Sequence, residues 1–555
     1  MKKIQVIALS LGLFLLLAAC PADDGGGNNG NNSVNFVRLE ANGDDYSVTT
    51  LLTLVFDKDI YGLTTEDVVL NGGTTGASKG AFSKVGAGSF RLGITGVVSR
   101  GSISVTVSKS GYDIANNTQN VLAYFPKSWD VTFLAYGGIP QPENQAVVHS
   151  NTVARPLSPK KAGQLFTGWY EDEAFNTRWN FSTGTVTSDV TLYARYIGQD
   201  QIEQLSAWDY FEAENLTLGW NLGNTLDAGG LNETAWGNPR ITQELMNGVK
   251  ASGFSLIRIP VTWRASIGPA PDYIIAEALL QRVAEVVSYA ENAGLTAIIN
   301  VHHDGSWLNF NQARQSQENY DRITDQFAKV WAQIADYLKD FGLFLMFSPF
   351  NEIHDGNWGS GNLEPRQFEI INNWNQVFTD TVRGSGGMNA IRYLVIPGLC
   401  QKPHLYGEDQ FILPQDAVAG KLAVSFHYYE PYPFAHDGQD PYWGNADDYN
   451  VPASYFTIFK ERFTGKQVPV IIGEIGPIVY KLGSQNPGNV AMAHENRLKY
   501  IGCVYGTAKS MGITPVYWDN GIANTHEYQI LNRDTGLPLD EVSRECIEAM
   551  IKATQ

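Results

Sequence analysis

The pattern of apolar and polar positions changes twice along this chain. From Val34 to about Phe125, short runs of alternating apolar and polar residues, such as Leu51–Phe56 and Ser102–Val107, are separated by turns rich in Gly, Asn, Ser and Thr. Alternation with a period of two residues is typical of half-buried β-strands, and closely spaced turns indicate an antiparallel arrangement. We therefore predict a small β-sandwich over residues 34–125.

A second β-rich unit is predicted over residues 129–197. It contains Phe166-Thr167-Gly168-Trp169-Tyr170 and ends in a strand-like run from Val190 to Tyr196. The first unit loosely resembles bacterial Ig-like surface domains, and the second resembles the β-grasp-type B-repeat of internalins. Neither carries a cluster of His, Cys or paired carboxylates, so we interpret both as spacers. The alternative is sugar binding through exposed Trp169 or Trp179, although Trp169 is also expected in the core of its own unit.

After Gln201 the pattern becomes one of short apolar runs that alternate with helical stretches, which indicates βα units around a parallel sheet. Helices are expected over Ala276–Ala293, Ile323–Phe341 and Gln367–Arg383. The eight expected strands are Leu216–Leu222, Leu256–Val261, Ala297–Val301, Phe344–Pro349, Tyr393–Ile396, Ala423–Phe426, Pro469–Gly473 and Pro515–Trp518. Eight such units predict an α/β fold, a (β/α)8 TIM barrel over residues 203–552 preceded by two small β-rich domains.

Polar or aromatic residues stand at or just beyond the ends of most of these strands. In a closed parallel barrel the carboxyl ends of all strands meet at one mouth, so these residues are expected to converge. They are Asn221, Asn224, Arg258, His302, His303, Asn351, Glu352, His427, Tyr429, Glu474 and Trp518.

Two of these residues are glutamates that directly follow buried strands. Glu352 follows the fourth strand and Glu474 the seventh, and a carboxylate in such a position costs desolvation free energy unless it is paired or used. Glycoside hydrolysis uses two carboxylates about 5 Å apart, one as nucleophile and the other as acid and then base. The alternative is two unrelated structural carboxylates that cap the helices after their strands. The presence of both among the other strand-end residues favours the catalytic interpretation.

Seven segments, in order, resemble glycoside hydrolase family 5, and within it the endoglucanases of subfamily 4. The resemblance covers about Glu203 to Ile551 with no departure at the motif positions. The segments are Gly219-Trp220-Asn221-Leu222-Gly223-Asn224-Thr225-Leu226-Asp227-Ala228, Ile257-Arg258-Ile259-Pro260-Val261-Thr262-Trp263, Asn300-Val301-His302-His303-Asp304, Phe350-Asn351-Glu352, Ser425-Phe426-His427-Tyr428-Tyr429, Ile472-Gly473-Glu474 and Tyr517-Trp518-Asp519-Asn520-Gly521.

The resemblance implies Glu352 as acid/base and Glu474 as nucleophile of a retaining endo-β-1,4-glucanase. Its substrates would be plant cell-wall β-glucans such as cellulose, mixed-linkage glucan or xyloglucan. A xyloglucan- or xylan-preferring enzyme and a non-catalytic glycan-binding surface lipoprotein are the alternatives. Arg258 and Tyr429 would donate hydrogen bonds to Glu474, which favours an ionised carboxylate.

Further roles are implied for the remaining strand-end residues. Asn351 would contact the sugar 2-hydroxyl, Asn224 the neighbouring sugar, and Trp518 would stack under the ring at the cleavage site. His302, His427 and Tyr429 would position the sugar and the two carboxylates. Trp307, Trp358 and Trp443 are further possible sugar platforms, or ordinary packing residues.

A metal site at His302-His303-Asp304 is the main competing hypothesis, that of a metal-dependent hydrolase. Successive strand side chains point to opposite faces, so adjacent histidines are not expected to bind one ion. One of the two is expected to face the pocket, and the resemblance implies that it is His302, with His303, also a candidate substrate-binding residue, packed behind it. Asp227 and Asp519 are expected to make loop hydrogen bonds. No metal and no cofactor is predicted.

The charge and the first residues change the picture of location and partners. A net charge of -18 on 555 residues argues against nucleic-acid binding. Lys2-Lys3, the 14 apolar residues from Val6 to Ala19, and Leu17-Ala18-Ala19-Cys20 resemble a bacterial lipoprotein signal over residues 1–20, with Cys20 lipidated. A low-complexity linker follows over 21–33.

We therefore expect an exported monomer that a lipid anchor holds to the bacterial cell envelope, at the cell surface or outer membrane. Its partners would be the β-glucan substrate and the membrane. Three cysteines remain after Cys20, namely Cys400, Cys503 and Cys546, and this odd number favours buried thiols over disulfide bonds.

Overall fold

The computed structural model describes residues 32–555, with short gaps at 155, 157–158, 160, 163, 180, 182–183, 230–231, 439, 479–486 and 522–527. The expected signal segment 1–20, its Cys20 and all but the last two residues of the linker 21–33 lie outside the described residues. The chain divides into two compact units: one runs up to Val131 and adds Gln145–Val153 and Thr185–Val190, and the other comprises Thr132–Asn144, Ala154–Gly184 and Thr191–Gln555.

The first β-rich region is a two-sheet sandwich, as the alternating pattern predicts. Its strands are β1 Asn32–Ala41, β2 Leu51–Phe56, β3 Val68–Asn71, β4 Ser78–Gly86, β5 Ser89–Thr95, β6 Gly101–Val107, β7 Tyr112–Ala115 and β8 Thr118–Ala123, with a short 3-10 helix η1 at Thr65–Asp67. The sheet orders are β4-β5-β2-β1-β7 and β3-β6-β8. The inward residues of both sheets, such as Phe36, Leu54 and Val105, share one core. The expectation of a wholly antiparallel sandwich is wrong in one pair, since β1 and β7 are parallel.

The second β-rich region is a four-stranded sheet in the order β10-β9-β12-β11. Its strands are β9 Ser128–Leu134, β10 Gln145–Val148, β11 Gln164–Tyr170 and β12 Val190–Gly198, and the boundary between the compact units passes through this region. Trp169 is 2% exposed and Trp179 8% exposed. Trp169 is therefore a core residue, and sugar binding through exposed Trp169 or Trp179 is ruled out.

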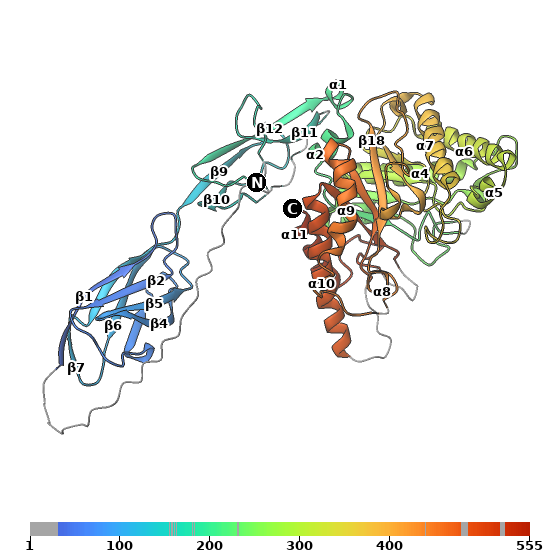
Figure 1. The fold of residues 1–555 in the computed structure, drawn as a ribbon. Helices are drawn as coiled ribbons and strands as arrows, with labels where there is room; N and C mark the ends of the chain where they lie inside the picture. Colours follow the sequence, from blue (N-terminus) through green and yellow to red (C-terminus); the bar gives the residue numbers. More distant parts are fainter. Residues whose placement is uncertain are drawn as a thin grey trace, which may run out of the picture. The chain divides into compact units, whose positions relative to one another are not determined.

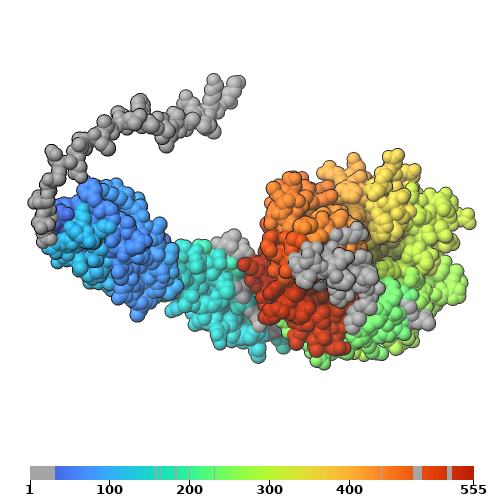
Figure 2. Space-filling model, turned by 90° about the horizontal axis from the view of Figure 1, so that it is seen from below, coloured from blue at the N-terminus to red at the C-terminus, as the bar shows by residue number. Residues whose placement is uncertain are grey.

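The remaining strands close into a parallel barrel, which confirms the predicted fold class (Figure 1). They are β13 Gly219–Leu222, β14 Leu256–Ile259, β15 Thr296–Asn300, β16 Leu345–Ser348, β17 Leu394–Pro397, β18 Leu422–Tyr428, β19 Val470–Ile475 and β20 Ile513–Asp519. Closure comes from β13, which pairs with β14 on one side and with β20 on the other. The red C-terminal residues accordingly lie beside green residues from the start of the barrel (Figure 2).

Two helices, α1 Gln199–Ile202 and α2 Ala207–Ala213, precede the first barrel strand, and helices follow most of the barrel strands. The latter are α3 Gln243–Ala251, α4 Glu277–Ala293, α5 Phe310–Gln315, α6 Gln317–Leu338, α7 Pro365–Gly384, α8 Tyr432–Ala435, α9 Val451–Arg462, α10 Pro487–Ser510 and α11 Glu541–Thr554. The 3-10 helices are η2 Arg264–Ser266, η3 Gly387–Ala390, η4 Leu399–Gln401, η5 Pro403–Leu405 and η6 Thr464–Lys466. In the described part of the chain, no helix has both the length and the apolarity needed to cross a bilayer.

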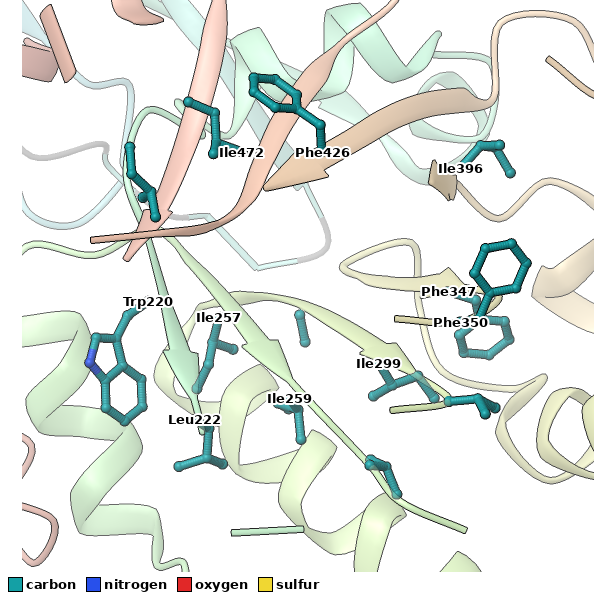
Figure 3. Packing of buried hydrophobic residues seen from close by; sticks show 14 of the residues in the cluster. Trp220, Leu222, Ile257, Ile259, Ile299, Phe347, Phe350, Ile396, Phe426 and Ile472 are labelled. Atoms are coloured by element: carbon teal, nitrogen blue, oxygen red, sulfur yellow. The ribbon is translucent and has the colours of Figure 1, made fainter. Parts of the chain in front are cut away.

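Local sequence accounts for the ends of the long helices. The Ser316 side chain accepts the Asn319 backbone N–H at the start of α6, and Gly294 ends α4 in the left-handed conformation that glycine adopts without strain. The apolar faces of these helices pack on the outward side chains of the strands, such as Ile257, Ile299 and Phe347 (Figure 3).

The inside of the barrel is built in two layers. Alternate residues of the strands point inward, and those in the lower layer are apolar: Leu256, Ile298, Met346, Val395, Ala423, Ile471 and Val516. Two residues further along five of these strands stand Arg258, Asn300, Ser425, Gly473 and Trp518. The polar side chains of this second layer thus pack on the apolar lower layer, at the carboxyl ends of the strands.

Candidate active site

Arg258 lies at the centre of the second layer and joins three strands. Its Nη1 donates to Asn221 Oδ1 and to Glu474 Oε1, both at 2.9 Å, and its Nη2 donates to Asn351 Oδ1 at 2.7 Å. Only 4% of the Arg258 side chain is exposed. Because a buried guanidinium needs a counter-charge and fixed acceptors, this network holds Glu474 and Asn351 in defined orientations.

Glu474 reaches the network because β19 contains a bulge. Phe426 pairs with Ile472 but His427 pairs with Glu474, so Gly473 has no partner on β18. A bulge changes the direction in which the following side chain points. A side chain at Gly473 would not fit, since its Cβ would lie 2.7 Å from Ser425 Oγ. The Tyr429 hydroxyl donates to Glu474 Oε2 at 3.2 Å, which confirms both hydrogen bonds expected for this carboxylate.

Glu352 and Glu474 meet at one imidazole nitrogen. His427 Nδ1 lies 2.7 Å from Glu352 Oε1 and 3.6 Å from Glu474 Oε2. One oxygen of each carboxylate and a ring nitrogen of His427 all lie within 4.8 Å of one another. Burial lowers the pKa of His427 to about 3, so the ring is neutral and its contact with Glu352 is a hydrogen bond.

The environment raises the pKa of Glu352. Burial is the largest cause, and the positive charges of Arg258, Lys402, His354 and His436 oppose it without cancelling it. The Glu352 side chain keeps 23% of its surface exposed, so it is accessible from the barrel mouth. A carboxyl group that holds its proton and remains accessible is suited to act as a general acid.

His302, Asn351 and Trp518 lie next to this pair. Asn351 Nδ2 is 3.4 Å from His302 Nε2, and the rings of His302 and Trp518 are parallel with centroids 6.0 Å apart. Asn300, which the sequence analysis did not single out, contacts His302 Nδ1 through its Nδ2 at 3.1 Å. Its position in the inward period of β15 was the available signal.

His302 and His303 do not point to opposite faces of a strand, so the expectation used against a metal site is wrong. β15 ends at Asn300, so strand alternation no longer applies at His302 and His303, whose rings lie edge to face with centroids 4.4 Å apart. Candidate ligand atoms of Asp227, His302 and His303 lie within 4.8 Å of one another. Burial, and after it the charges of Arg264 and Arg258, lower the pKa of His303 to about 4, and these two positive charges disfavour a cation there.

His303 does not pack behind the pocket as expected. Its side chain is 42% exposed, and its ring centroid lies 5.6 Å from that of Trp236. Asn224 is 9% exposed on the turn after β13, where its backbone has a positive φ of 56°. Its backbone N–H donates to Asp227 Oδ2 at 3.0 Å. This hydrogen bond stabilises the turn that carries Asn224.

Asp227 and Asp519 make loop hydrogen bonds, as predicted. Asp227 Oδ1 accepts the Thr225 N–H at 2.7 Å, and burial raises its pKa to about 6. Asp519 Oδ2 accepts the indole N–H of Trp220 at 3.1 Å, and its Oδ1 accepts from Arg533 at 2.9 Å. Both carboxylates stabilise the turns that carry the site.

The three further tryptophans differ in exposure. Trp443 is 5% exposed and packs against Tyr449 and Tyr500, so the packing alternative is correct for this residue. Trp307 is half-buried and its indole N–H donates to Asp304 at 2.7 Å. Trp358 is 42% exposed and stacks on His354 with centroids 3.8 Å apart. Trp358 alone of the three keeps a largely open face.

The cysteine prediction holds for two of three thiols. Cys400, Cys503 and Cys546 are all free; Cys400 and Cys546 are buried, and Cys503 is half-buried. Burial raises the pKa of the Cys400 thiol to about 12, so it stays protonated and does not act as a nucleophile.

The fold is a parallel (β/α)8 barrel, and the glutamates at the ends of its fourth and seventh strands both lie close to His427 Nδ1. These features define the protein as a glycoside hydrolase. The model of the cellulase family, glycosyl hydrolase family 5, matches residues 223–524, and the chain belongs to this family. The model of the Listeria-Bacteroides repeat domain matches residues 129–195, in agreement with the B-repeat resemblance of the second β-rich region.

Individual relatives agree with this assignment. Endoglucanase A of Paenibacillus barcinonensis is 36% identical over 347 residues, which is 57% of this chain and 83% of that protein. A broad-specificity endoglucanase of subfamily 4 from Bacteroides salanitronis is 39% identical, with a TM-score of 0.58, and the match covers 62% of this chain and 94% of that structure. A family 5 xyloglucanase from Paenibacillus pabuli, solved with a ligand, is 34% identical with a TM-score of 0.56, over 62% and 99% of the two chains.

Proposed function

We propose that this enzyme is a retaining endo-β-1,4-glucanase that works by double displacement. The observation that carries the proposal is the shared contact of Glu352 and Glu474 with His427 Nδ1, at 2.7 and 3.6 Å. Ligand oxygens of the two glutamates lie within 4.8 Å of each other. This separation matches the roughly 5 Å of retaining enzymes and is shorter than the roughly 6.5 Å at which the inverting range begins.

In the first step, a Glu474 oxygen attacks the anomeric carbon and forms a glycosyl ester. The bond from that carbon to the leaving oxygen breaks, and Glu352 gives its proton to this oxygen. Because its pKa is raised, the Glu352 carboxyl group keeps the proton that this step requires. Arg258 and Tyr429 hold the Glu474 carboxylate for the attack through their hydrogen bonds.

In the second step, water attacks the same carbon and releases Glu474. The negative charge of Glu474 is absent from the ester, so Glu352 can lose its proton and take one from the water. Asn351 would contact the 2-hydroxyl, where hydrogen bonds strengthen in the transition state. Trp518 and His302 would hold the faces and edges of the same sugar ring.

The substrate class follows from the named relatives. The relatives include endoglucanases and a xyloglucanase, which makes β-1,4-linked glucans the first candidates and a xyloglucan preference the second. Exposed aromatic faces such as Trp358 and Trp236 suit sugar rings beyond the cleavage site. The intact pair of glutamates argues against a barrel that only binds glycan.

A hydrolysis panel tests the proposed specificity. We expect rapid loss of viscosity and a ladder of oligosaccharides from carboxymethyl cellulose, mixed-linkage β-glucan and xyloglucan, and slower hydrolysis of xylan. Random internal cleavage produces long fragments before short ones. Release of monosaccharide alone at constant viscosity would contradict internal cleavage.

We further propose that Cys20 carries the lipid of an envelope anchor, which the sequence Leu17-Ala18-Ala19-Cys20 supports. Acyl chains bind membranes by about 0.8 kcal/mol for each buried CH₂. In a bacterial host, Cys20→Ala is expected to abolish labelling by radioactive palmitate and to move the enzyme from the membrane fraction to the soluble one. Equal labelling of Cys20→Ala and wild type would refute the anchor, and the barrel variant Cys503→Ala serves as control.

A further inference from the structure

The Asn300 side chain makes two contacts, one through its amide oxygen and one through its NH₂ group. Asn300 ends β15 in the second inward layer and is 1% exposed. The backbone N–H of Val261 donates to its Oδ1 at 3.3 Å, and its Nδ2 lies 3.1 Å from His302 Nδ1. A backbone N–H can only donate, so the oxygen of the amide must face Val261 and the NH₂ group must face the imidazole.

This orientation decides where His302 carries its proton. An NH₂ group can only donate, so Nδ1 must present its lone pair to Asn300. The ring is neutral, because burial and the nearby positive charges lower its pKa well below the usual value. A neutral imidazole has one N–H, and this N–H must therefore be on Nε2.

The Nε2 side of the ring meets a second donor. Asn351 Oδ1 already accepts from Arg258 at 2.7 Å, so the Asn351 NH₂ group is the part that faces Nε2, at 3.4 Å. Both NH₂ groups thus compete for the one lone pair of the ring, and the shorter contact, 3.1 Å to Asn300 against 3.4 Å to Asn351, assigns the lone pair to Nδ1 and the N–H to Nε2. The N–H of Nε2 and the NH₂ of Asn351 then lie side by side as two donors. Both donors are satisfied only when an oxygen that accepts two hydrogen bonds lies within reach of both.

We propose that Asn300 is a positioning residue that fixes His302 as an Nε2–H donor, so that His302 and Asn351 together bind one hydroxyl oxygen of the sugar at the cleavage site. The proposal rests on the proposed function for the identity of the ligand. Asn300 touches no substrate in this scheme and acts through the ring of His302. The chain of contacts runs from the Val261 backbone through Asn300 to His302.

Asn300→Asp tests the proposal because aspartate has nearly the same shape as asparagine. The substitution changes only the group that faces His302 Nδ1, from a hydrogen-bond donor to an acceptor. One carboxylate oxygen can still accept the Val261 N–H, but the other now accepts from Nδ1, so the neutral ring turns its lone pair toward the sugar. We expect the Tm to stay within a few degrees of wild type and kcat/KM at neutral pH to fall about 10- to 100-fold, as for a lost hydrogen bond that leaves a buried polar group unpaired.

The pH profile gives a readout that a structural role would not move. The added carboxylate favours the imidazolium, in which both nitrogens carry protons and Nε2–H is restored. The relative activity of Asn300→Asp should therefore recover as the pH falls, whereas that of His302→Ala should not. In the double variant with His302→Ala, Asn300→Asp should cost no more than a factor of about two.

Nitrogen-15 spectra of histidine-labelled enzyme test the tautomer without substrate. We expect His302 to be protonated at Nε2 and unprotonated at Nδ1 in wild type, with the reverse in Asn300→Asp at neutral pH, and His302→Ala identifies the signals. Protonation of Nδ1 in wild type would overturn the proposal, as would a full loss of activity from Asn300→Asp in the His302→Ala background. Failure of the proposed function would instead appear as a wild-type enzyme inactive on every β-glucan, with the spectra unchanged.

Discussion

Replacing Glu474 with alanine is expected to abolish the hydrolysis of β-glucans. Glu474 is the carboxylate that Arg258 and Tyr429 hold at the end of β19, and without it no covalent glycosyl ester can form. We expect kcat to fall about 10⁴-fold or more, the scale at which enzymes lose activity with their nucleophile. Reducing-end release from mixed-linkage β-glucan measures the loss.

The Glu474→Ala variant should keep its fold and bind polysaccharide. The Arg258 guanidinium loses its counter-charge but retains Asn221 and Asn351 as acceptors, so the variant should remain folded with a lowered Tm. Azide should restore cleavage of an activated aryl glucoside by entering the vacated space, with an α-glycosyl azide as product. Glu369→Ala, at a half-exposed pair with Arg366, is the matched control and should remain fully active. Substantial β-glucan hydrolysis by Glu474→Ala would overturn the mechanism.

Replacing Glu352 with glutamine should produce a loss that depends on the leaving group. The acid is needed when the departing oxygen is a poor leaving group, as in a polysaccharide, and general acid catalysis is worth about 10²- to 10⁴-fold. We expect a loss of that size on β-glucan. With a dinitrophenyl cellobioside, which departs without a proton, formation of the glycosyl ester should be nearly unchanged, and a burst of dinitrophenol should precede slow turnover.

The pH profile separates Glu352 from other acids. Only protonated Glu352 can act in the first step, so wild-type activity should fall as the pH rises through its raised pKa. Glu352→Gln should lose this decline at high pH and keep the decline at low pH. An equal loss on β-glucan and on the dinitrophenyl substrate, with the decline at high pH retained, would remove Glu352 from the role of acid.

Much of the fold was predictable because local patterns agree with the tertiary arrangement. Each of the eight apolar runs became a barrel strand, and the helix from Glu277 to Ala293 begins one residue from the expected position. The strands are buried on both faces, so they appear as short continuous apolar runs. Arg258 and the two glutamates could be placed at one mouth because parallel strands end on the same side.

Other features could not be read from spacing. The pairing of His427 with Glu474 depends on the bulge at Gly473, where a side chain would collide with Ser425 of the neighbouring strand. His303 was placed by extending strand alternation past Asn300, where β15 has already ended. Trp443 carries no local mark of burial, since the aromatic rings that enclose it come from distant segments.

The sequence by itself determined the class of fold, the order of the motifs and the positions of the two glutamates at strand ends, because these depend on periodicity and on which residue ends each strand. Only the tertiary structure decided how the groups act on one another. The contact of 2.7 Å between Glu352 Oε1 and His427 Nδ1, and the orientation of the Asn300 amide that the Val261 backbone fixes, depend on distances between different strands. Such distances are set by closure of the barrel, which no local pattern encodes.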